Sequence, residues 1–115
     1  MSVKIYHNPR CSKCRLTMEL LEEANISPDV VKYLETPPNR EELQEILKML
    51  NMSPRELMRT HEAEYKDNQL DNKALSDDEL INAMIAHPIL IERPIVVSNG
   101  RAVIGRPPVN VKTIL

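Results

Sequence analysis

The chain has 115 residues, of which 42% are hydrophobic and 28% charged, and its formal net charge is −2. This length predicts a single domain over residues 1–115, and the small negative charge gives no overall attraction to DNA or to an anionic membrane. With three tyrosines, no Phe and no Trp, there are few side chains on which bases could stack, and no apolar stretch reaches the roughly 20 residues of a membrane span.

The first third of the chain predicts a strand, a helix and a second strand. Residues 3–6 alternate in polarity and predict a strand, and residues 7–10 form a turn around a proline. No apolar signal-peptide segment precedes the strand, so we expect a cytoplasmic protein. A helix should begin at Cys11 or Ser12, with an apolar stripe made of Leu16, Leu20, Leu21 and Ala24. Residues 30–34 predict a second strand, parallel to the first.

Three helix starts follow in the middle of the chain. Asn39 is a candidate N-cap because a glutamate follows it three residues later, and the segment 53–56 (SPRE) has the same pattern with proline at the first helical position. Residues 60–75 are polar and predict a loop or a frayed helix. Ser76 opens a further helix, which should end at His87 because a proline follows.

The end of the chain predicts a hairpin and a short helix. Residues 95–97 predict a strand, and the Asn-Gly pair within Ser98–Arg101 is a hairpin signal. Residues 102–104 should return antiparallel to the strand 95–97. A terminal helix should begin at about Val109. The predicted order is therefore β-α-β, three helices, then β-β-α.

Cys11 is the strongest candidate for chemistry. It stands at the first turn of a helix, where unpaired backbone N–H groups and the helix dipole stabilise a thiolate. Such positions lower a cysteine pKa from about 8.5 to roughly 3.5–7.5. His7, Arg10, Lys13 and Arg15 add nearby positive or proton-accepting groups.

Cys14 has three possible roles. It lies one helical turn after Cys11 and is a candidate partner for a disulfide or a candidate resolving cysteine. It is alternatively a small core residue on the buried side of the helix. A third alternative is that Cys11 and Cys14 form half of a zinc site. The chain has no further cysteine, however, and His61 and His87 lack ligand spacing. We therefore expect no metal.

Arginines form the second signal. Arg93 and Arg106 each precede a proline beside the hairpin, and Arg59 should end the helix that starts at Ser53. Guanidinium groups near a helix N-terminus suit a tetrahedral oxyanion. A single arginine is more often a solvated surface residue, and we assign four in this way: Arg15, Arg40, Arg55 and Arg101.

The combination of motifs resembles the glutaredoxin-dependent arsenate reductases, the ArsC-like family. The resemblance covers nearly the whole chain. It rests on the following segments: Y-H-N-P before Cys11, 33–40 (YLETPPNR), 57–59 (LMR), 86–91 (AHPILI), the R-P-I-V-V strand from Arg93, and G-R-P-P from Gly105.

The resemblance implies an α/β, thioredoxin-like (glutaredoxin-like) fold with a mixed four-stranded sheet and a helical insert over about 39–92. It implies that Pro94 is a cis-proline facing the cysteine loop. It also implies site roles. Cys11 attacks arsenate, and His7 favours its thiolate. The oxyanion is held by Arg59, Arg93 and Arg106, with Asn8 and Arg10 beside it.

The implied activity is arsenate reduction, which serves arsenic detoxification. The Cys11 thiolate attacks arsenate, glutathione reduces the adduct, arsenite leaves, and glutaredoxin recycles the mixed disulfide. The protein would hold no bound cofactor and would act as a monomer, with arsenate or a similar oxyanion, glutathione and glutaredoxin as partners. The alternative is a redox-switched, Spx-like regulatory protein. In that case a Cys11–Cys14 disulfide changes a surface that binds RNA polymerase.

Overall fold

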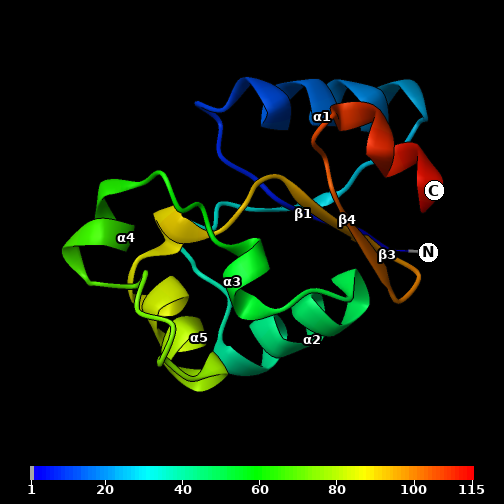
Figure 1. The fold of residues 1–115 in the computed structure, drawn as a ribbon. Helices are drawn as coiled ribbons and strands as arrows, with labels where there is room; N and C mark the ends of the chain where they lie inside the picture. Colours follow the sequence, from blue (N-terminus) through cyan, green and yellow to red (C-terminus); the bar gives the residue numbers. More distant parts are fainter. Residues whose placement is uncertain (1) are drawn as a thin grey trace. The chain divides into compact units, whose positions relative to one another are not determined.

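The computed structural model describes residues 2–115. The chain forms two compact units (Figure 1). The first consists of residues up to Thr36 together with Arg93–Leu115, and the second is the helical segment Pro37–Glu92. The second unit covers the region, about 39–92, over which we expected a helical insert. Among the described residues, no helix is both long enough and apolar enough to cross a lipid bilayer.

The first unit is built on a mixed four-stranded sheet in the order β2-β1-β3-β4. Its strands are β1 (Val3–Tyr6), β2 (Asp29–Val31), β3 (Ile95–Ser98) and β4 (Arg101–Ile104). Strand β1 pairs in parallel with β2 and antiparallel with β3, and β3 pairs antiparallel with β4. The predicted sheet and hairpin are confirmed.

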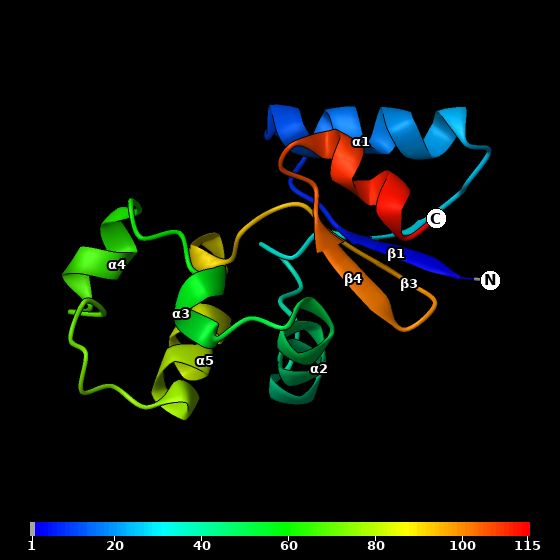
Figure 2. The same ribbon diagram turned by 45° about the vertical axis from the view of Figure 1, so that its right-hand side comes forward.

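Two helical elements cover one face of this sheet. Helix α1 (Ser12–Glu23) and the 3-10 helix η2 (Pro108–Thr113) contact each other, and both ribbon views show them on the same side of the strands (Figures 1 and 2). The core between them contains six buried side chains: Val3, Ile5, Leu21, Val96, Val111 and Ile114.

The terminal helix differs from the regular helix in the predicted β-β-α order. It is a 3-10 helix that begins at Pro108, and its N–H groups bond to carbonyls three residues earlier, as from Asn110 to Pro107 (3.0 Å). Two prolines at its start have no N–H to donate, and 3-10 turns are common in such short segments.

The apolar stripe predicted for α1 is partly wrong, although Leu21 is buried and Leu20 packs against the core. The buried residues of this helix are Cys14, Thr17 and Leu21, whereas Leu16 is 45% exposed. Thr17 tolerates full burial because its hydroxyl donates to the Lys13 carbonyl over 2.8 Å. Tertiary packing therefore selects a face that contains a small polar residue, which apolar periodicity does not detect.

The second strand is also shorter than predicted. β2 ends at Val31, because the N–H groups of Glu35 and Thr36 both bond to the Lys32 carbonyl and turn the chain. Tyr33 therefore lies in a turn, where it is 1% exposed, while Leu34 is 41% exposed.

The second unit contains the three expected helices, α2 (Arg40–Leu50), α3 (Pro54–Leu57) and α5 (Asp77–Ala86). It also contains a short helix, α4 (Ala63–Asp67), within the segment 60–75 where we expected a loop or a frayed helix, and the 3-10 helix η1 (Pro88–Leu90). Asn39, Ser53 and Ser76 each form a capping box with a glutamate three residues later. The three predicted starts are confirmed because a capping box is a local interaction that the sequence alone specifies.

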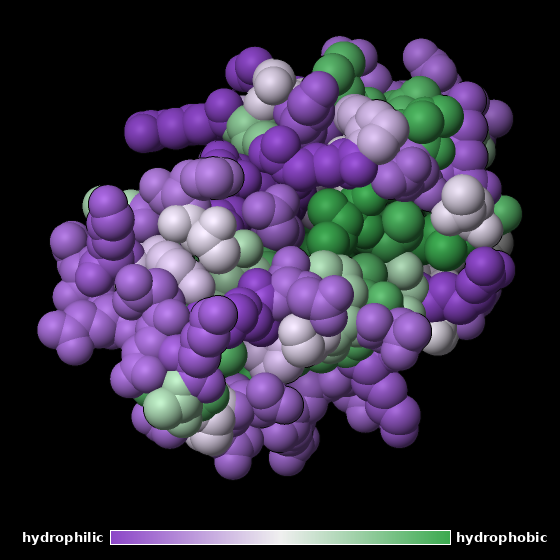
Figure 3. All heavy atoms as spheres, in the orientation of Figure 1, coloured by the Kyte–Doolittle hydropathy of each residue, from purple (hydrophilic) through white to green (hydrophobic). Residues whose placement is uncertain are grey.

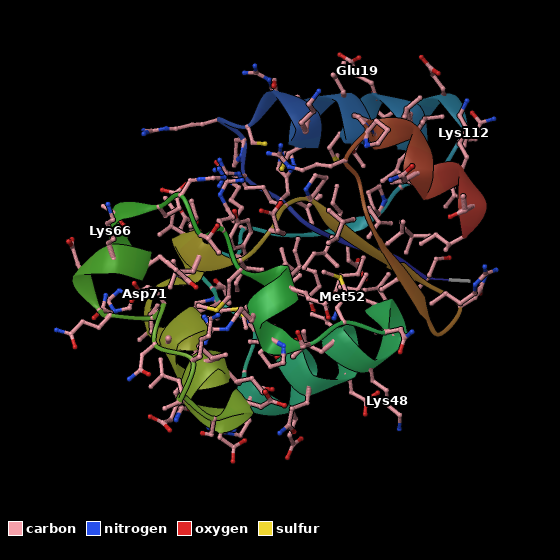
Figure 4. All side chains as sticks on the ribbon, viewed as in Figure 1. Glu19, Lys48, Met52, Lys66, Asp71 and Lys112 are labelled. Carbon is pink, nitrogen blue, oxygen red and sulfur yellow. The ribbon has the colours of Figure 1, made fainter. Side chains whose placement is uncertain are left out.

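Arg55 is not the solvated surface residue that we expected. Its guanidinium donates to the Tyr65 hydroxyl and the Leu70 carbonyl, each over 2.7 Å, and to the Asn72 carbonyl over 3.0 Å. These hydrogen bonds connect helix α3, which contains Arg55, to the polar segment around α4. The visible face of that segment is mainly hydrophilic (Figure 3), with Lys66 and Asp71 pointing outward (Figure 4).

Candidate functional site

The sheet of the first unit gathers the candidate residues at one edge. In the antiparallel register, Tyr6 of β1 lies opposite Ile95 of β3, and Ile95 lies opposite Ile104 of β4. The end of β1, the start of β3 and the end of β4 therefore meet. Cys11 follows the first of these ends, Arg93 precedes the second and Arg106 follows the third.

Asn8 shapes the loop that carries the cysteine. Its side-chain oxygen accepts from the Arg10 N–H, and its carbonyl accepts from the Cys11 N–H, both over 3.0 Å. Asn8 is 8% exposed, so its structural role is to hold the loop. Arg10 itself is exposed, and its backbone, rather than its side chain, takes part in this turn.

Cys11 is the N-cap of α1 and is 7% exposed. Burial on its own raises the pKa of the Cys11 thiol. The backbone N–H of Cys14, the Arg93 side chain, the Cys14 thiol and the backbone of Lys13 act in the opposite direction and bring the pKa down to about 7. These donors stabilise the thiolate although the sulfur makes no full capping hydrogen bond to the helix. A large fraction of Cys11 is therefore nucleophilic at neutral pH.

Two arginines approach this sulfur. The Arg106 Nη2 donates to Cys11 Sγ over 3.8 Å, and its Nε donates to the Arg93 carbonyl over 2.8 Å. In Arg93, Nε and Nη1 are buried and have no hydrogen-bond partner within residues 2–115. Burial lowers the pKa of Arg93, but Cys11 and Tyr33 reverse this effect and raise it overall, so the guanidinium stays charged. A half-buried charge with two buried and unpaired donors is suited to binding an anion.

His7 is not the full positive charge that would stabilise the Cys11 thiolate as a neighbouring cation. It is 9% exposed at the end of β1, and its Nδ1 is buried without a partner in the described chain. Burial first, and then the charge of Lys32, lowers its pKa below 6.5. His7 is therefore mostly neutral at pH 7 and adds no full positive charge near Cys11.

The peptide bond before Pro94 is cis, in agreement with the resemblance, and the Arg106–Pro107 bond is also cis. Pro94 packs against Gly105. A Cβ on Gly105 would lie 2.8 Å from Pro94 Cγ and 2.7 Å from Thr17 Oγ1. This glycine lets the segment after β4, orange in Figures 1 and 2, pass beside α1. The close approach positions Arg106 beside the cysteine loop.

Arg59 lies in the second unit. Helix α3 ends at Leu57, so our expectation that Arg59 ends that helix is wrong. The Arg59 Nε donates to Glu62 over 3.1 Å, in an ion pair that is about one-fifth exposed, and the Arg59 N–H bonds to the Leu90 carbonyl. This ion pair orients the guanidinium and leaves its two terminal nitrogens outside that pair.

Sequence reasoning assigned no site role to Tyr33. It is almost fully buried and contributes to the raised pKa of Arg93. A signal was available, because it is one of only three aromatic residues in the chain. Within the described residues, no three His, Cys, Asp or Glu side chains gather in a way that could hold a metal ion.

The sheet, the cysteine at the start of α1 and the adjacent arginines define a thioredoxin-like protein with an acidic thiol beside arginine side chains. The comparisons identify the family. A sequence profile of the ArsC family matches residues 6–114, and the chain belongs to this family.

Several relatives span the same length as this chain. It is 55% identical over 114 residues to the uncharacterized protein YfgD of Escherichia coli K12, covering 98% of this chain and 96% of that one. It is 49% identical to an arsenate reductase of Haemophilus influenzae over the whole length of both chains. The solved arsenate reductase from Vibrio cholerae is 54% identical, covers 100% of this chain and 98% of its own, and superposes with a TM-score of 0.97.

Proposed function

We propose that this protein is a glutathione- and glutaredoxin-dependent arsenate reductase. The observation that carries the proposal is the Cys11 thiol, whose pKa is lowered to about 7 beside Arg93, a side chain with two buried and unpaired nitrogen donors. Such a pair combines a nucleophile with a site for the charge of a tetrahedral oxyanion. Full-length similarity to proteins named arsenate reductase supports arsenate as that oxyanion.

In the proposed reaction, the Cys11 sulfur bonds to arsenic(V), and one arsenate oxygen leaves as water after protonation. Arg93 and Arg106 stabilise the charge on the remaining oxygens, and Arg59 contributes as the family resemblance implies. A glutathione thiolate then attacks the Cys11 sulfur. The sulfur–arsenic bond breaks, its electron pair passes to arsenic, and arsenite and a Cys11–glutathione disulfide result. Glutaredoxin reduces that disulfide.

The proposal also implies an oligomeric state, a cellular compartment and the absence of a bound cofactor. All of its catalytic groups come from one chain, so a monomer suffices. Both cysteines are free and buried, a state that the reducing cytoplasm maintains. No bound cofactor is required, because glutathione supplies the electrons.

The test is a coupled assay in which arsenate, glutathione, glutaredoxin, glutathione reductase and NADPH are combined with the wild-type protein or with Cys11→Ser. We expect NADPH oxidation that requires both arsenate and Cys11. Wild-type protein that shows no arsenate-dependent oxidation would refute the proposal.

A redox-switched regulator is the second candidate, favoured by the two neighbouring free thiols. In that case oxidation alters binding to RNA polymerase, and there is no steady-state arsenate reduction. Pull-downs with reduced and oxidised protein distinguish the two candidates, because the regulator must retain polymerase in only one redox state.

A further inference from the structure

Cys14 has no part in the reaction as written so far, although it lies at the site. It is fully buried on the first turn of α1, three residues after Cys11, and both thiols are free. The two side chains interact, because each is among the causes that shift the pKa of the other. The structure therefore holds a second thiol against the nucleophile from the buried side.

The electrostatics of Cys14 depend on the state of Cys11. Burial is the largest cause that raises the Cys14 pKa, and the hydrogen bond and charge of Cys11 raise it further, to about 12. The Asn8 backbone and the charge of Arg93 act in the lowering direction. Once Cys11 is bonded to another atom, it no longer carries the thiolate that disfavours ionisation of Cys14. The Cys14 thiol therefore stays protonated while Cys11 is the nucleophile, and its pKa falls after Cys11 has reacted.

We propose that Cys14 is the resolving cysteine of this enzyme, releasing arsenite by forming a disulfide with Cys11. The inference rests on the arsenate reductase function proposed above and changes the source of the reducing electrons. Its basis is the burial of Cys14 and its position one helical turn after Cys11.

The step balances within the chain. The Cys14 thiol gives up its proton, and its sulfur attacks the Cys11 sulfur of the Cys11–arsenic(V) adduct. A sulfur–sulfur bond forms and the sulfur–arsenic bond breaks, with its electron pair passing to arsenic. Two thiols are thereby oxidised to one disulfide, and arsenic(V) is reduced to arsenic(III). Glutathione, through glutaredoxin, then reduces the Cys11–Cys14 disulfide.

Access favours the internal thiol over an external one. Cys11 is only 7% exposed, so a glutathione molecule must reach a nearly enclosed sulfur, next to which Cys14 already lies. A tethered nucleophile in contact with its target also avoids the entropy cost of a bimolecular encounter.

A single-turnover experiment tests the proposal. Reduced protein is freed of small thiols under anaerobic conditions and mixed with arsenate. The reaction is then quenched with acid and an alkylating agent, and arsenite and disulfides are measured. Trypsin cuts after Arg10, Lys13 and Arg15, so it separates the two cysteines. A Cys11–Cys14 disulfide then appears in the mass spectrum as two short peptides joined to each other.

With the wild-type chain we expect about one arsenite per protein and loss of both thiols without any glutathione. Cys14→Ser should release no arsenite under these conditions and should show at least a tenfold lower kcat in the coupled assay, where glutathione must act directly on the adduct. Cys11→Ser should give neither product.

The outcomes separate the two proposals. If the wild-type chain turns over in the coupled assay but releases no arsenite without glutathione, Cys14 is not the resolving cysteine and the reductase proposal stands. If Cys14→Ser releases as much arsenite without glutathione as the wild type, the inference is also wrong. If the wild type fails in both assays, the reductase function fails, and the resolving role fails with it.

Discussion

Replacing Arg93 with glutamine should raise the pKa of Cys11. The Arg93 side chain is one of the donors that lower this pKa to about 7, against the opposing effect of burial. Glutamine keeps part of the volume and can still donate a hydrogen bond, but it removes the positive charge. A nearby opposite charge lowers a pKa by roughly 1–3 units. Because three further groups also lower the pKa of Cys11, we expect an upward shift of about one unit.

The size of the shift decides what to measure. A thiol with a pKa of about 7 is about half ionised at pH 7, and a pKa one unit higher leaves about one-tenth ionised, a fivefold loss of thiolate. Each remaining thiolate is more nucleophilic by about threefold, because nucleophilicity rises with pKa with a Brønsted slope of about 0.4–0.5. The rate at pH 7 therefore falls by less than about twofold, whereas the midpoint of the pH profile moves by the full unit.

The assay is the rate of Cys11 alkylation by iodoacetamide across pH, located by mass spectrometry of the tryptic peptides. Arg101→Gln is the matched control, because Arg101 is an exposed arginine at the far end of β4. We expect a midpoint near 7 for the wild type and the control, and near 8 for Arg93→Gln. A midpoint that stays at about 7 in Arg93→Gln, or that moves equally in the control, would refute the electrostatic role of Arg93.

Three further changes test the fold. Gly105→Ala should lower the free energy of unfolding by about 1–3 kcal/mol, because the new Cβ would overlap Thr17 and Pro94; an unchanged urea midpoint contradicts this. Burial holds the folded pKa of His7 below 6.5, so neutral His7 contributes to the free energy of unfolding above about pH 6.5, and this contribution declines as the pH falls. His7→Gln should flatten the decline between about pH 7 and 5.5. An equal slope of unfolding free energy against pH in the variant and the wild type would disprove this prediction. Ser76→Ala removes the N-cap of α5 and should cost about 1 kcal/mol in urea unfolding, whereas no loss would show that the cap is redundant.

Local interactions explain what the sequence predicted well. The capping boxes that begin with Asn39, Ser53 and Ser76 involve residues three apart, so each helix start could be identified without knowledge of the fold. The Asn-Gly turn is similar. Asn99 and Gly100 both have positive φ, 56° and 73°, as the tight hairpin requires.

Interactions between distant segments explain what the sequence did not predict. The buried face of α1 centres on Thr17 rather than Leu16, because Gly105, 88 residues after Thr17, comes close to that position. Arg55 was assigned to the surface because nothing in its neighbourhood indicated that Tyr65 and Leu70 would return to it. Such contacts depend on how the chain folds back and have no periodic pattern in the sequence.

The site itself combines both kinds of interaction. Cys11 was predictable because a helix start acts on its own first residue, but its pKa of about 7 also needs Arg93 from the far end of the chain. The hairpin turn sets that contact. A two-residue turn at Asn99–Gly100 places Ile95 opposite Ile104, so that Arg93 and Arg106 leave the hairpin at the same end and Arg106 donates to the Arg93 carbonyl. A shift of one residue in this register would move every side chain of the strand to the opposite face of the sheet and separate the two arginines. The turn lies at the opposite end of the hairpin from Cys11, yet its geometry is what brings both guanidinium groups to the sulfur.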